Sequence, residues 1–238
     1  MEFGSNRPTG VNLAREGVMS ILFVLLTFLL IITVTYFRRP TEEMQMQPEA
    51  PRPRTAPVMA KLAGFEIPTG YSFHPGHTWV ADEGHQNARV GMDSFAAQLF
   101  GKIDRIETVE LNRWVRQGQK LWTVTHNGTS VDMLSPIEGV VVSLNHQVIK
   151  NPSSVGSDPY KDGWVCVVKS PDMHTNMKNL IQGPLVAPWM QNTLNRLGAL
   201  ASQYTPAMAQ DGGMPVSGLL SQMDPATQER IVREFFLT

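Results

Sequence analysis

The residues best placed to do chemistry surround one tight turn, Asn127-Gly128. Apolar and polar residues alternate on both sides of this dipeptide over 122–141, which indicates two strands joined by a hairpin. Asn-Gly favours a type I′ turn, because both of its positions need a positive φ. Next to the turn lies His126, with hydroxyl and carboxyl groups on either side of it. These groups belong to Thr125, Thr129, Ser130 and Asp132.

A catalytic role for His126 would require a hydroxyl oxygen about 3 Å from its ring, in a pocket that excludes water. A hairpin tip exposed to solvent offers no such pocket. We therefore predict a solvated polar turn without catalytic residues, and we keep His126 as a candidate contact for a partner protein.

Histidine and cysteine positions give little support to a metal site. His74 and His77 are three residues apart in a turn or strand segment, and no further ligand completes the three or four that zinc needs. Cys166 is the single cysteine, which excludes an intramolecular disulfide. It lies in an alternating run, so we expect a buried strand thiol. Motifs for nucleotides, phosphates, serine hydrolysis and paired carboxylates are also missing, so we predict no enzyme, no cofactor and no small-molecule substrate.

The overall charge excludes another class of partner. The 238 residues include 20 basic and 21 acidic residues, and only 17% are charged. A nucleic-acid-binding protein needs a clustered basic face, so we expect no nucleic-acid partner.

One long apolar run lies near the N-terminus. Residues 18–37 carry no charged side chain, and about 20 helical residues match the ~30 Å hydrocarbon core of a bilayer. Signal peptides have shorter apolar cores, about 7–15 residues, that end in small residues. This run instead ends in an aromatic pair followed by two arginines. We predict a single transmembrane helix at 18–37, after an N-terminal tail at 1–17.

Basic residues predict the orientation of this helix. They are Arg7 and Arg15 before the run, and Arg38, Arg39, Arg52 and Arg54 after it. Because cytoplasmic flanks carry the excess of basic residues, we expect most of the chain in the cytoplasm. The segment 38–64 is rich in proline and is predicted to be an extended linker.

Short alternating runs separated by turn residues follow from 65 to 172, a cadence typical of an antiparallel sandwich or barrel. The strand candidates are 77–82, 87–92, 103–111, 120–126, 130–136, 139–146 and 163–170. A short helix is predicted after Asp93 or Ser94 as its cap, with Gly101 at its end. Residues 173–238 form a helical extension, with helices expected at 189–204 and from Pro225, capped by Asp224. We expect this extension to pack on the core or on a partner.

Several motifs of this region occur in the order and spacing of one known family. They are HTWV (77–80), VGMDSFAAQLFGKI (90–103), VEL (109–111), SPIEG (135–139), NP (151–152) and DPYKDGW (158–164). The stretch 71–171 thus resembles the H-protein of the glycine cleavage system, a lipoyl carrier. This resemblance implies a mainly β fold: a flattened antiparallel barrel, or barrel-sandwich hybrid, with the carrier hairpin at one end. Neither the predicted membrane helix nor the C-terminal extension belongs to the ordinary family.

The resemblance also implies a lysine on the hairpin that carries lipoic acid through an amide bond. Counting back from the DMLSP motif, that position holds Gly128, and the acidic residue expected three positions earlier is Thr125. No lysine occurs between Lys120 and Lys150. Without an amine there is nothing to acylate, so we expect the hairpin to be present and its attachment chemistry to be lost.

A second departure from the family lies in 109–118, where several residues are missing after the VEL strand. The rebuilt loop contains Trp114 between Arg113 and Arg116. Trp114 could simply close the mouth of the barrel. Since Trp and Arg are common anchors of protein interfaces, the three residues are also candidate partner contacts.

These observations predict a non-catalytic, membrane-anchored accessory or scaffold subunit of a membrane protein complex. An electron-transfer or respiratory complex is the suggested host, by analogy with the family's redox cofactor. Three alternatives stay open. The first is a lipoyl or acyl carrier related to glycine cleavage but modified at another lysine (Lys102, Lys120 or Lys150). The second is an enzyme that uses His126 or polar residues of the C-terminal tail, and the third is an assembly factor.

Overall fold

The computed structural model describes residues 10–37, 59–62, 64–204 and 217–237. The chain forms two compact units, Met1–Thr55 and Ala56–Thr238. We call the second unit the body. The first unit contains the helix α1 (Gly10–Phe37), which begins earlier than predicted and therefore includes part of the tail expected at 1–17.

The described side chains of α1 are largely apolar and exposed from Val18 to Val34. Among the residues that the structure describes, however, no helix combines the length and the apolar character that crossing a membrane requires. A helix is thus found at the predicted position, whereas its predicted transmembrane character is not supported. The predicted linker falls mainly on 38–58, outside the described residues.

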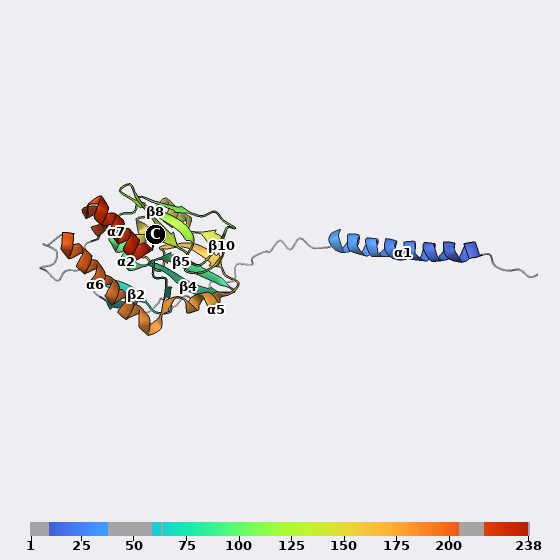
Figure 1. The fold of residues 1–238 in the computed structure, drawn as a ribbon, viewed down its shortest axis with the longest axis horizontal. Helices are drawn as coiled ribbons and strands as arrows, with labels where there is room; N and C mark the ends of the chain where they lie inside the picture. Colours follow the sequence, from blue (N-terminus) through green and yellow to red (C-terminus); the bar gives the residue numbers. More distant parts are fainter. Residues whose placement is uncertain (1–9, 38–58, 63, 205–216, 238) are drawn as a thin grey trace, which may run out of the picture. The chain divides into compact units, whose positions relative to one another are not determined.

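The described part of the body contains twelve short strands, and helices pack around them (Figure 1). The strands are β1 (Met59–Leu62), β2 (Phe65–Pro68), β3 (Ser72–Phe73), β4 (Thr78–Gly84), β5 (Asn87–Met92), β6 (Arg105–Thr108), β7 (Trp114–Val115), β8 (Lys120–His126), β9 (Thr129–Leu134), β10 (Gly139–Leu144), β11 (Trp164–Lys169) and β12 (Ile181–Gln182). The α-helices are α2 (Ser94–Phe100), α3 (His146–Lys150), α4 (Ser154–Ser157), α5 (Met173–Lys178), α6 (Val186–Tyr204) and α7 (Pro225–Phe236). The described residues also include the 3₁₀ turns η1 (Gly183–Leu185) and η3 (Leu219–Gln222).

The larger sheet has seven antiparallel strands in the order β12-β3-β4-β5-β11-β10-β7. Cross-strand rows explain which residues it buries. Val80, Val90 and Cys166 are register partners in one row, and all three are buried. The Cys166 thiol is therefore a core group, as predicted, and burial raises its pKa.

A second sheet has three strands in the order β6-β8-β9, and β8 and β9 form the predicted hairpin, while β1 and β2 form a separate two-stranded sheet. The Thr78 hydroxyl of β4 donates a 2.8 Å hydrogen bond to the Leu134 carbonyl of β9, which ties the three-stranded sheet to the larger one. Apolar side chains from both sheets, such as Trp79 and Trp122, belong to one continuous core. The mainly β, antiparallel fold class predicted from the sequence is confirmed.

Helix α2 begins and ends at the residues that the sequence indicated. The Asp93 carboxylate accepts a hydrogen bond from the backbone N–H of Ala96, and Gly101 forms the C-cap with a positive φ of 66°. A side chain at 101 would also be excluded by packing, because a Cβ there would lie 2.7 Å from the Cα of Gly218. The backbone of the C-terminal extension at Gly218 therefore packs directly against the end of α2.

The C-terminal extension (residues 173–238), which is the last part of the body, packs on the rest of it. Figure 1 shows α6 and α7, in orange and red, against the strands. Phe235 and Phe236 are buried, and their rings contact Phe95 and Phe100 of α2. The Asp224 cap and the start of α7 at Pro225 are as predicted, while α6 begins three residues before the expected position.

Two predicted domain boundaries differ from the structure. The strand β1 begins at Met59 and pairs with β2, so the folded body starts inside the segment 38–64 assigned to the linker. At the other end, β12 pairs with β3 inside the extension that was expected to be helical. Both strands are short, and neither shows the alternation by which strands are identified in a sequence.

Candidate functional site

The tip of the β8–β9 hairpin has the geometry that its sequence predicts. His126 and Thr129 are register partners, which leaves Asn127 and Gly128 as a two-residue loop. Their φ values are 48° and 80°, as a type I′ turn requires. Gly128 is exposed, and a Cβ built on it would meet no atom within 4 Å. The tip thus presents position 128 to open space, but it presents no amine.

The backbone next to this tip is held from two sides. The Nδ1 of His126 donates a short hydrogen bond to the Lys102 carbonyl, and the Asn127 N–H donates to the Asp104 carboxylate at 2.8 Å. From the opposite side, the Thr129 hydroxyl donates to Oε1 of Gln228, on α7, at 3.0 Å. The hairpin is therefore fixed against both the α2–β6 loop and the C-terminal helix.

The position of His126 corrects the prediction that it is a solvated partner contact. The residue is only 5% exposed, and its Nδ1 is hydrogen-bonded to the Lys102 carbonyl. A carbonyl can only accept, so Nδ1 carries the hydrogen. In the neutral ring Nε2 is then an acceptor, and the Asn127 amide lies 3.2 Å from it.

The hydroxyl groups around the turn are likewise engaged across the hairpin. Thr125 and Ser130 lie 3.2 Å apart through their hydroxyl oxygens, and the Thr123 hydroxyl donates to the Asp132 carboxylate. That carboxylate also pairs with Lys120 at 2.8 Å. None of these hydroxyl groups is hydrogen-bonded to His126, so the arrangement contains no nucleophile–base pair at the hairpin.

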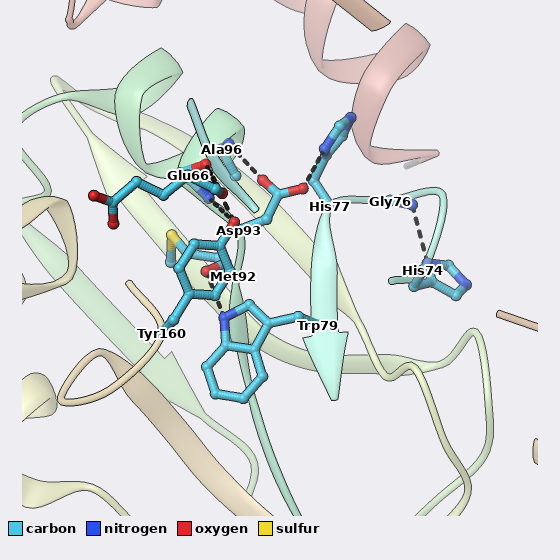
Figure 2. A network of polar contacts seen from close by, with 10 residues as sticks. Glu66, His74, Gly76, His77, Trp79, Met92, Asp93, Ala96 and Tyr160 are labelled. Atoms are coloured by element: carbon cyan, nitrogen blue, oxygen red, sulfur yellow. Dashed lines mark hydrogen bonds and ion pairs between the residues drawn. The ribbon is translucent and has the colours of Figure 1, made fainter. Parts of the chain in front are cut away.

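A second polar cluster lies where the extension meets the body (Figure 2). His77, with a positive φ of 62°, is 1% exposed. Its Nδ1 lies 2.7 Å from the Asp93 carboxylate that caps α2. The imidazole is stacked between the rings of Phe95 and Trp189, with centroid distances of 4.2 and 5.0 Å. Since Trp189 belongs to α6, His77 joins the extension to the body.

The contacts of the neighbouring His74 indicate that this second cluster, like the one at the hairpin, has a structural role. The Nδ1 of His74 accepts a hydrogen bond from the Gly76 N–H, and in Figure 2 its ring lies away from the His77–Asp93 pair. The pKa of His74 is lowered to about 4, mainly by burial and to a smaller extent by the charge of the nearby His77. Among the described residues no group of three or more His, Cys, Asp or Glu could hold a metal ion.

The predicted partner contacts of the rebuilt loop lie together at one edge of the larger sheet. Trp114 is in the edge strand β7, which pairs with β10. It is 46% exposed, and Arg113 and Arg116 are exposed on either side of it. Trp114 therefore does not act as a buried plug of the barrel. Of the four residues proposed as partner contacts, Arg113, Trp114 and Arg116 form one surface. The fourth, His126, is buried beside the hairpin turn.

The residues that hold the hairpin were not found in the sequence. Lys102, Asp104 and Gln228 have no local signal for this role, because their contacts with the turn span up to 99 positions of the chain.

Comparisons with known proteins give one consistent result. A sequence profile described as glycine cleavage H-protein matches residues 71–192. The glycine cleavage system H protein of Marinobacter nauticus is 31% identical over 107 residues, which are 45% of this chain and 82% of that protein. The H protein of Thermobifida fusca is 33% identical over 106 residues, or 44% of this chain and 82% of that protein.

Among solved structures, a glycine cleavage system H protein from Mycobacterium marinum matches 54% of this chain and 100% of its own chain, at 25% identity and a TM-score of 0.46. The profile match includes the β8–β9 hairpin and ends inside α6. Both α1 and α7 therefore lie outside the matched segment, although α7 contacts the hairpin.

Proposed function

We propose that this chain, which belongs to the glycine cleavage H-protein family, is a non-catalytic docking subunit whose carrier hairpin has become a fixed structural element. The observation that carries the proposal is Gly128. It occupies the tip position where the family resemblance implies the lipoyl lysine, and it provides no amine for an amide bond.

The contacts around the tip support the same proposal. A carrier has to deliver its cargo to several enzymes, which favours a tip that partners can surround. Here the hairpin contacts Gln228 of α7 and Asp104 of the α2–β6 loop. A surface that several enzymes once recognised can persist as a docking surface after the cargo is lost, so binding without transfer is the function that this geometry fits.

We further propose that the chain acts at a membrane, as an accessory subunit of a membrane protein complex, with most of its residues in the cytoplasm. This part rests on the sequence: residues 18–37 contain no charged side chain, and more arginines follow the run than precede it. An electron-transfer complex is the host that we propose, by analogy with the redox cofactor of the family.

Extraction of native membranes tests this function. The full chain, with a C-terminal tag, is extracted in a mild detergent, and the proteins that co-purify with it are identified and quantified. The proposal predicts a defined set of membrane proteins in fixed ratio to the chain. A chain that is released by alkaline washing of the membranes and purifies alone would contradict it. A ratio far below one per complex would instead indicate an assembly factor.

One observation favours a second candidate, a carrier modified at another lysine. The Lys102 carbonyl accepts a hydrogen bond from His126, so this exposed lysine lies beside the hairpin tip although it belongs to a different segment. Lys120 is paired with Asp132 at the other end of β8, and Lys150 ends α3. An acyl mass on the native chain that disappears in Lys102→Arg but persists in Lys150→Arg would establish this candidate, and an unmodified native mass would exclude it.

A further inference from the structure

One corner of the body gathers exposed apolar side chains. Outside α1, the large apolar side chains that the structure shows as exposed are Leu111, Trp114, Val142, Leu185 and Leu237. The first three come from β7, β10 and the turn before β7. We call this surface the β7–β10 corner and define it by Leu111, Arg113, Trp114, Arg116 and Val142.

Strand register places the members of the corner next to one another. Trp114 is the register partner of Val140, which in turn is the partner of Lys169. The neighbouring residues Val115, Val141 and Val168, each next in sequence to a member of this row, are buried. Because successive side chains of a strand point to opposite faces, Trp114, Val140 and Lys169 share the outer face of the sheet. Val142 lies at a bulge in the β10–β11 register and is 37% exposed.

The backbone of the corner is fixed before any partner arrives. The Asn112 N–H donates to the Val141 carbonyl at 2.8 Å, and the Val141 N–H donates to the Arg113 carbonyl at 3.0 Å. On the other side of Trp114, the Arg116 N–H donates to the Gln119 side chain at 3.0 Å. A pre-ordered surface loses less conformational entropy on binding, so its contacts are converted more fully into affinity.

Among the described residues, the two long helices of the C-terminal extension have their main contacts away from this corner. Helix α7 packs against β9, and α6 packs against β1 and β12. The short helix α5 lies beside the corner, where the Asn176 carbonyl accepts a hydrogen bond from the Gln117 side chain. The same chain therefore buries Phe235 and Phe236 against α2 while a tryptophan stays 46% exposed at the sheet edge.

The charges of the corner indicate what chemistry its partner has. Arg113, Arg116 and Lys169 are exposed, and among the described residues none of the three forms an ion pair. Two carboxylates, Glu110 and Glu138, flank the corner without pairing with either arginine. The cations are thus available to carboxylates of a partner, and bidentate arginine–carboxylate pairs are among the stronger polar contacts of interfaces.

We propose that the β7–β10 corner binds an acidic segment of a partner protein, in which an apolar side chain contacts Trp114 and flanking carboxylates pair with Arg113 and Arg116. This inference rests on the proposed docking function and names the surface and the partner chemistry for it. Binding uses the side-chain face, because β7 has two residues and is too short to template an added strand.

The first experiment identifies what covers the corner. In the full-length chain, expressed in its own cells, Val142 is replaced by the photo-cross-linker benzoylphenylalanine, and the matched control carries the same group in place of the exposed Leu185. Mass spectrometry of the adducts is expected to show, from position 142 alone, a peptide of one partner protein that contains Asp or Glu beside an apolar residue. Adducts with lipid, adducts with a second copy of this chain, or equal labelling from both positions would overturn the inference.

The second experiment tests the energetics of the same surface. Trp114→Ala and the double variant Arg113→Glu/Arg116→Glu should each reduce the yield of the cross-linked partner about tenfold or more, the loss typical of an interface anchor. A control of equal charge change, Lys150→Glu/Lys161→Glu, should leave the yield unchanged. If a complex co-purifies with all of these variants alike, the corner is not its binding surface while the docking function stands. If no complex co-purifies with the unaltered chain, the docking function itself is wrong.

Discussion

Gly128→Lys tests most sharply whether the hairpin is a carrier hairpin without its lysine. A Cβ at position 128 meets no atom within 4 Å, so a side chain can leave the backbone there without a clash. The only cost is the left-handed backbone, with φ at 80°, which destabilises a residue with a Cβ by about 1–2 kcal/mol. For a body of this size that loss lowers the midpoint of thermal unfolding by about 2–8 °C, so the variant should remain folded.

The assay is acylation by a lipoate ligase. The Gly128→Lys chain is incubated with the ligase, ATP and lipoic acid, and the new amide between the lysine Nζ and the lipoyl carboxyl is read as an added mass. We expect the variant to be modified and the unaltered chain, with Lys102 as its neighbouring amine, to stay unmodified. The matched control is Ser130→Lys, which places an exposed lysine on the adjoining strand.

Two results would refute the reasoning. If the folded Gly128→Lys chain is never modified while a family H protein is modified in the same reaction, the tip is not presented as a carrier tip. If Ser130→Lys is modified equally well, the ligase modifies any exposed amine, and position 128 is not recognised as a lipoylation position.

Three further predictions concern the joint between the body and its extension. Phe235→Ala, which removes a buried ring from the contact with Phe95, should lower the free energy of unfolding by about 3–5 kcal/mol in denaturant titrations; a loss below about 1 kcal/mol would mean that α7 is not docked there. Asp93→Ala should cost about 2–4 kcal/mol, because the cap of α2 and the partner of His77 are lost together, whereas Asp93→Asn, which retains an acceptor for the cap, should cost clearly less. The pKa of His74 is about 4 in the folded chain instead of 6.5, so between these values the native state binds fewer protons than the unfolded state. The free energy of unfolding should therefore fall as the pH drops from about 6.5 towards 4. His74→Gln should remove this part of the pH dependence, and an unchanged pH profile would show that His74 is not responsible.

Local rules explain which parts of the fold could be predicted from the sequence. The strands at 87–92 and 120–126 have the predicted bounds, since their alternation is long enough to define a period. The Asn127-Gly128 turn and the Asp93 cap follow from the backbone preferences of single residues. In each of these cases the determining interaction lies within a few positions of the residue concerned.

The site depended on contacts that no local pattern reveals. His126 has the sequence context of an exposed turn residue, yet the Lys102 carbonyl, 24 positions away, draws it into the body. Thr129 is bonded to Gln228 across 99 positions, so the role of α7 beside the hairpin could not be read from either segment. Trp114, by contrast, was identified as a candidate contact from its residue type and the rebuilt loop around it.

The central claim is that this chain docks into a complex and carries no acyl group. Native mass spectrometry of the complex extracted from its own membranes tests it directly, because one spectrum gives both the mass of the chain and the ratio of the subunits. The account predicts the unmodified mass of the polypeptide in fixed proportion to its partners. A chain that bears an additional acyl mass, or that is recovered without partners, would contradict it.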